Sequence, residues 1–218
     1  MMAYNDERLP VTLVGFNILA FDLPVLLRCS QYLGLTAPYI NLDRYRTPHC
    51  DLMQKLSFNG ALKFHSLTFY GKRFAVGVPD ATKSSDIAAL VQAGNWAAVE
   101  AHCRADVETT AALAERLGLL TPQGLVFDLE TVAIDDAADY IEAGSAPTNY
   151  KDPEKIAAYV AEAKAAAVSK CALDPDLCRV VALGYRLPDG SVTCYTSGDS
   201  NERDIIEDFW RVYRAVGK

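Results

Sequence analysis

The sequence predicts an α/β protein with a mixed β-sheet, and two patterns support this prediction. Short runs of β-branched and apolar residues alternate with longer segments of helix-like apolar spacing. Two of the β-rich runs, 179–187 and 191–197, are joined by Pro188-Asp189-Gly190, which is typical of a hairpin turn. An antiparallel hairpin combined with strands that are separated by helices gives a mixed sheet.

Each element of the first half follows from local spacing and from its end signals, such as Gly34 after an apolar helix and Gly118 after a longer one. The expected elements are a buried strand at 11–16, a connector at 17–21, a helix at 23–33, a loop-rich stretch at 35–83, a helix from Ser84 or Ser85 to about residue 92, and a long helix at 95–117.

The second half begins at Thr121-Pro122-Gln123-Gly124, which has the composition of a boundary. The expected elements are a strand at 125–130, an alanine-rich helix at 149–169, the two hairpin strands, and a last helix that starts at Ser200 or Asn201 with Ile205, Ile206, Phe209, Trp210 and Tyr213 on its apolar face.

Composition limits the class of protein. The chain has 218 residues, of which 50% are hydrophobic and 22% charged, so it can bury a core and is not a disordered sequence. The net charge of −7 argues against a module that coats nucleic acid by charge alone. It remains compatible with an enzyme that meets phosphate through divalent cations held by its own carboxylates.

The chain is expected to be cytoplasmic, of a bacterial or phage type, with no membrane partner. No apolar run approaches the roughly 20 residues that span a bilayer, and the first residues are too polar for a signal peptide. The six cysteines show no pairing or zinc-like spacing, which favours reduced thiols.

Two acidic residues stand two apart in an expected strand. Asp128 and Glu130 would share one face of the strand, inside an otherwise apolar segment. One interpretation is a strand with a solvated face. The other is a metal site, because a hard cation offsets the repulsion between neighbouring carboxylates.

Two further positions have a structural and a functional interpretation. Asp22 stands just before a helix and, with Pro24 in the first turn, fits a helix N-cap; Asn17 fits a turn former. His102 and Asp106 are four apart in the long helix and therefore share a face, either as a solvated pair or as part of a site.

Taken together, three stretches resemble the exonuclease motifs of the DEDD, or DnaQ-like, 3′–5′ exonuclease superfamily. They are Phe-Asp-Leu-Glu-Thr at 127–131, Gly-Phe-Asn-x-x-x-Phe-Asp at 15–22 and His-x-x-x-Asp at 102–106. The resemblance is strongest to the predicted PolB-like 3′–5′ exonucleases, including phage-encoded members. It implies an RNase H-like fold with a mixed sheet flanked by helices.

The resemblance also implies a mechanism and a set of site residues. Two Mg²⁺ or Mn²⁺ ions would serve phosphodiester hydrolysis at 3′ ends of DNA or in single-stranded DNA, with RNA as the alternative polymer and a catalytically silent nucleic-acid-binding module as the alternative function. The implied metal ligands are Asp128, Glu130, Asp22 and Asp106. His102 would orient or deprotonate the attacking water. Asn17, Phe21 and Thr131 would hold the terminal nucleotide, or serve packing alone.

Two features depart from the superfamily pattern. His102 stands at the spacing that the superfamily gives to a tyrosine, so we expect it to point into the site. The first motif, at 127–131, follows the other two, which indicates a circular permutation of a single domain over 1–218. Residues 1–120 would supply the second and third motifs and residues 121–218 the first motif, the hairpin and the following helix. The strand at 125–130 would then lie next to that at 11–16, in a monomer or a swapped dimer.

Overall fold

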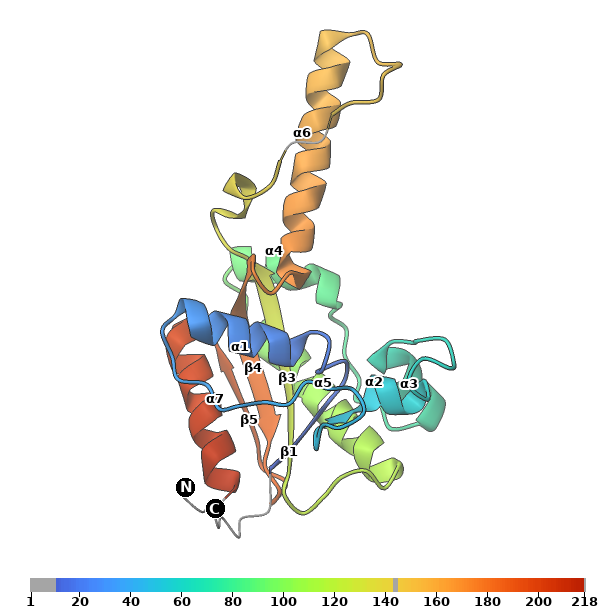
Figure 1. Ribbon diagram of the computed structural model, residues 1–218, viewed down its shortest axis with the longest axis vertical. Coiled ribbons are helices and arrows are strands. Elements are labelled where there is room, and N and C mark those ends of the chain that lie inside the picture. Colours follow the sequence, from blue (N-terminus) through green and yellow to red (C-terminus); the bar gives the residue numbers. More distant parts are fainter. Residues whose placement is uncertain (1–10, 143–144, 218) are drawn as a thin grey trace, which may run out of the picture.

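The computed structural model describes residues 11–142 and 145–217, which form one five-stranded sheet with helices around it (Figure 1). The strands are β1 (Thr12–Gly15), β2 (Cys50–Asp51), β3 (Gly124–Ala133), β4 (Cys178–Arg186) and β5 (Val192–Thr196), in the order β2-β1-β3-β4-β5. β1 is parallel to β2 and to β3, whereas β3, β4 and β5 are antiparallel. The predicted mixed α/β sheet is confirmed.

Helices cover both faces of this sheet. They are α1 (Asp22–Tyr32), α2 (Leu52–Leu56), α3 (Leu67–Phe74), α4 (Ile87–Gln92), α5 (Trp96–Arg116), α6 (Pro153–Lys170) and α7 (Glu202–Val216). Asn201 precedes the last helix, α7, and its side chain accepts a hydrogen bond from the backbone N–H of Asp204 at 3.0 Å. Asn201, and not Ser200, is therefore its cap.

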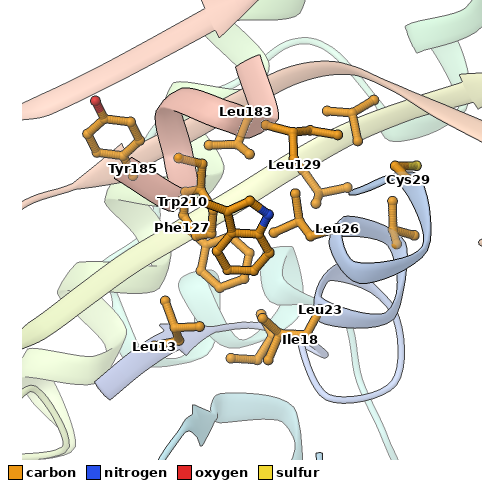
Figure 2. Close-up of a cluster of buried hydrophobic side chains, with 14 of the residues drawn as sticks. Leu13, Ile18, Leu23, Leu26, Cys29, Phe127, Leu129, Leu183, Tyr185 and Trp210 are labelled. Carbon is orange, nitrogen blue, oxygen red and sulfur yellow. The ribbon is translucent and has the colours of Figure 1, made fainter. Parts of the chain in front are cut away.

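The main core lies between the sheet and the helices α1 and α7 (Figure 2). Phe127 and Leu129 of β3 project into this core, where Phe127 contacts Phe209 with ring centroids 5.0 Å apart. Val126 packs on the opposite face with α5. Because strand side chains alternate, Asp128 belongs to the α5 face as well. Phe127 and Leu129 thus fix one face of β3 in the main core and place Asp128 and Glu130 on the other face.

The expected pairing of the two strands that carry motif residues is confirmed. β1 pairs with β3 in parallel, with Leu13 opposite Leu125 and Val14 opposite Val126. At the far end of the chain, a Cβ added to Gly217 would lie 3.0 Å from Val11 Cγ2. The end of α7 therefore lies against the start of β1.

One interpretation of the first half is wrong and one stretch is defined more closely. The stretch 35–83, expected to be mixed and loop-rich, contains β2, α2 and α3, which are too short to produce a clear period in the sequence. Asp22 is not a helix cap. Phe21 occupies the cap position of α1, no side chain caps that helix, and Asp22 is its first helical residue.

The helix α6 projects away from the sheet, with no buried residue along its length (Figure 1). It starts at Pro153, later than expected, with Asp152 as its cap. Among the described residues, no helix combines the length and the apolar character needed to cross a membrane.

Candidate active site

The residues that line one cleft of about 790 Å³ include four carboxylates from three elements. They are Asp22 of α1, Asp106 of α5, and Asp128 and Glu130 of β3. The structure therefore brings together the four acids that the sequence singled out. Parallel pairing of β1 with β3 is the reason, because α1 starts just beyond β1 and beside the middle of β3.

A tight turn after β1 sets the position of Asp22. A Cβ at Gly15 would overlap Ile18 Cγ2 and lie 3.0 Å from the Phe127 carbonyl oxygen, so only glycine fits there. Asn17 follows with a φ of 66°, in the left-handed region. The Ile18 carbonyl then accepts the N–H of Leu23 at 2.9 Å. These contacts direct the chain into α1 with Asp22 facing the sheet.

Three of the four acids form the tightest group. One carboxylate oxygen from each of Asp106, Asp128 and Glu130 lies within 4.8 Å of the others. Opposite ligands of Mg²⁺ stand about 4.2 Å apart, which is twice the usual Mg–O distance of about 2.1 Å. Oxygen-only donors at this separation fit a hard divalent cation such as Mg²⁺ or Mn²⁺. Asp22 lies at the side of this group, in the same cleft.

The charges of these acids are not balanced within the described residues. Burial raises the pKa of Asp22 to about 7. The pKa of Asp128 lies well above its usual range, first because of burial and then because Asp106 and Asp22 are close. Burial and the same neighbours raise the pKa of Glu130, and burial raises that of Asp106 although His102 opposes the rise. Such a cluster needs protons or a cation.

His102 is 4% exposed, so the solvated-pair interpretation is wrong for it. Its Nε2 lies 3.5 Å from Glu130 Oε1 and 3.3 Å from Ser84 Oγ, and its Nδ1 is hydrogen-bonded to Asp80. The side chain thus faces the acidic group, as its tyrosine-like spacing predicted. It lines a neighbouring cavity of about 730 Å³, which shares Ser84 and Asp106 with the main cleft.

The three residues expected to hold a nucleotide all line the main cleft, but they differ in what their side chains already do. Phe21 and Asn17 are partly exposed at the cleft, and Asn17 also supplies the strained turn. Thr131 donates its hydroxyl to the Ala172 carbonyl oxygen at 2.5 Å. The Thr131 hydroxyl therefore already supports the fold at the irregular pairing after Glu130.

Two acids near the site were missed by the sequence analysis. Asp51 caps α2 and also accepts the backbone N–H groups of Asn17 and Leu19, each at 3.1 Å. An acid directly before an apolar helical run was a usable signal for the cap. Asp80 contacts His102 from a loop, and no local sequence pattern predicted this contact.

The mixed sheet with helices on both faces has the α/β architecture of an RNase H-like exonuclease fold. Residues 4–147 match the model of a family described as predicted 3′-5′ exonucleases related to the exonuclease domain of PolB, and the chain belongs to this family. The matched segment contains all four clustered acids and His102. No curated protein and no solved structure matches the chain.

Proposed function

We propose that this protein is a metal-dependent 3′–5′ exonuclease that hydrolyses phosphodiester bonds from the 3′ end of DNA. One observation carries the proposal: in a member of a predicted exonuclease family, Asp22, Asp106, Asp128 and Glu130 line a single cleft. Buried carboxylates that repel each other are suited to divalent cations. The proposed substrate is single-stranded DNA or the 3′ end of a DNA strand.

Two cations, Mg²⁺ or Mn²⁺, are proposed to bind here, with Asp106, Asp128 and Glu130 as the main ligands. Asp22 of α1 would complete the set at the side of this group. When bound, the cations supply charge stabilisation at the phosphate and lower the pKa of a water. The carboxylates would hold the cations inside a cleft that is apolar on much of its remaining surface.

His102 is proposed to act on the attacking water. Its Nε2 is directed toward Glu130, so it can accept a proton from a water held at the acidic group and leave a hydroxide that attacks phosphorus. Phe21 is proposed to stack on or wedge against the terminal base. Asn17 and Thr131 are proposed to border the same nucleotide.

We also propose that residues 1–218 form a single domain with a permuted strand order. In a chain read from β3, the strands β3, β4 and β5 pair in succession, and α7 then leads to β1 beside β3. The contact between Gly217 and Val11 supports this order. A chain that starts at Gln123 and joins Lys218 to Met1 is expected to fold and to cleave like the present one.

The proposed assembly is either a monomer, in which β3 pairs with β1 of the same chain, or a swapped dimer. Exchange of residues 125–218 between two copies would give the dimer, and light scattering at micromolar protein separates the two. A cytoplasmic location is supported by six cysteines that are all free of disulfides in the described residues.

The test is cleavage of a 5′-labelled oligonucleotide with Mg²⁺ or Mn²⁺, run in parallel on DNA and RNA of one sequence. A ladder that shortens from the 3′ end of DNA is expected. Faster shortening of RNA would make the protein an exoribonuclease of the same fold. Retained binding with no cleavage in either metal would overturn the proposal in favour of a silent binding module.

A further inference from the structure

A short chain of polar contacts leads away from the acidic group through His102. The Nδ1 atom of His102 is hydrogen-bonded to Asp80 Oδ2, while Nε2 lies 3.3 Å from Ser84 Oγ and 3.5 Å from Glu130 Oε1. Both ring nitrogens are therefore engaged, one with a carboxylate and the other with the site. The His102 side chain is 5% exposed and the Asp80 side chain 19% exposed, so a buried imidazole meets a carboxylate at the protein surface.

The loop that carries Asp80 is fixed just ahead of this residue. Before it, the backbone N–H of Val78 donates to Thr109 Oγ1 of α5 at 3.0 Å. In addition, a Cβ at Gly71 would lie 3.1 Å from the Gly77 Cα and 3.1 Å from Thr109 Cγ2, so two glycines let α3, the loop and α5 approach closely. The loop is thereby anchored to the same helix that carries His102.

The carboxylate of Asp80 is itself oriented. Its Oδ1 accepts the backbone N–H of Thr82 at 2.9 Å, which leaves Oδ2 for His102. Burial alone would raise the pKa of Asp80, but the hydrogen bonds from His102 and from the Thr82 amide bring that pKa below its usual value. Asp80 is accordingly an acceptor near neutral pH, and the Nδ1 of His102 is the donor.

We propose that Asp80 is a positioning residue that holds His102 in the tautomer with the proton on Nδ1, so that the Nε2 lone pair faces Glu130 and the attacking water. This inference rests on the proposed function, because the lone pair serves hydrolysis only if the acidic group is the reaction centre. A neutral histidine has two tautomers, and the partner of one nitrogen decides which is present.

The proton balance follows directly. The O–H bond of the water breaks, its proton forms a new bond to Nε2, and the hydroxide attacks phosphorus as the bond to the leaving 3′ oxygen breaks. The imidazolium that results is stabilised by the Asp80 carboxylate, which does not itself take up the proton. The leaving 3′ oxygen takes up a proton from solvent, and His102 passes its Nε2 proton to solvent and regains its lone pair.

The test compares Asp80→Asn with Asp86→Asn in the full chain. Asp86 is an exposed acid in the same loop region, and its carboxylate accepts only the Ser85 hydroxyl at 3.2 Å among the described residues. We expect D80N to lower kcat by about 10- to 100-fold with little change in KM, and D86N to leave both unchanged. The double variant D80N/H102A should be no slower than H102A alone.

The second readout is independent of activity. The chain has three histidines, so long-range ¹H–¹⁵N spectra resolve each imidazole, and His102→Ala assigns the signal. Recorded above the ordinary histidine pKa of about 6.5, wild type should show a protonated Nδ1 on His102, and D80N should lose that preference. An unchanged tautomer or an unchanged kcat in a folded D80N would overturn the inference. A wild type that shows this tautomer but cleaves no nucleic acid would instead overturn the proposed function.

Discussion

Asp51 ends β2 and Asp128 lies in the middle of β3, the two strands that flank β1, yet the two acids stand in opposite environments. The Asp51 carboxylate accepts three backbone N–H groups, from Asn17 and Leu19 at 3.1 Å and from Gln54 at 3.2 Å. Burial raises the pKa of Asp51, and these amides act against the rise. No hydrogen bond to the Asp128 carboxylate is found within residues 11–142 and 145–217.

The difference separates a carboxylate that supports the fold from carboxylates that are left for a ligand. Asp51 ties the turn after β1 to the start of α2, and its oxygens have their partners inside the protein. Asp128 meets the charges of Asp106, Asp22 and Glu130 instead. Buried acids whose oxygens lack donors cost free energy in the cation-free protein. The molecule retains them where a cation would bind.

The largest effect should come from Asp128→Asn. We expect cleavage to fall by at least about 10³-fold, because the ligands of one site act as a unit. The unfolding midpoint of the cation-free variant should stay level or rise, since one of several repelling charges is gone. Nuclease assays and thermal melts in EDTA check both parts. Cleavage by D128N at close to the wild-type rate would remove Asp128 from the site.

The second-largest effect should come from His102→Ala. This variant should cleave roughly 10²-fold more slowly if the His102 side chain accepts the proton of the attacking water. Single-turnover cleavage of a labelled oligonucleotide measures it. His49→Ala is not a suitable control, because His49 accepts the Leu13 N–H inside the sheet at 3.2 Å. His65, which stacks on Phe69 with centroids 4.0 Å apart, is the better one. A loss of only a few-fold in H102A would limit His102 to orienting water.

At Asp51 we predict a loss of stability, the opposite of the effect expected for Asp128→Asn. Asp51→Ala leaves three amides without their acceptor, and we expect a loss of about 1–3 kcal/mol in the free energy of unfolding. Asp51→Asn keeps one acceptor oxygen and should lose less. Urea denaturation of both variants, beside D128N, measures the contrast. Equal destabilisation by D51A and D128N would contradict the distinction between the two acids.

A smaller, pH-dependent effect should appear at Asp22. Its pKa rises from 3.8 in the unfolded chain to about 7 in the folded protein, so the folded state holds more protons between these values. Stability from this group is therefore lost as pH rises from about 4 to about 7 and is level beyond. Asp22→Asn removes the titration, so its stability relative to wild type should increase over that range.

Melts in EDTA across this pH range test the prediction. A constant difference between D22N and wild type would mean that Asp22 is ionised throughout. Repeating the melts with Mn²⁺ gives a second comparison, because a bound cation should remove the advantage of the Asn variant by stabilising wild type.

The sequence predicted the parts of the site that lie on regular elements. The alternation in 125–130 placed Asp128 and Glu130 on one face, and the four-residue spacing placed His102 and Asp106 on one side of a helix. The neighbouring position of β1 and β3, confirmed in the structure, followed from the motif resemblance and not from local pattern.

Contacts between distant loops could not be predicted in this way. Two of the three amides that bind the Asp51 carboxylate come from a turn 32 and 34 residues earlier, and Asp80 reaches His102 across 22 residues. Neither loop has a period that fixes where its side chains point. The two-residue strand β2 is likewise too short to stand out from its surroundings.

The most direct test of the central claim is to locate the cations. A crystal of the protein grown with Mn²⁺ and measured at the manganese absorption edge would give an anomalous difference map. We predict two peaks in the cleft, from two cations bound by Asp106, Asp128, Glu130 and Asp22. Strong peaks elsewhere with none among these carboxylates, in protein that cleaves DNA under the same conditions, would contradict it.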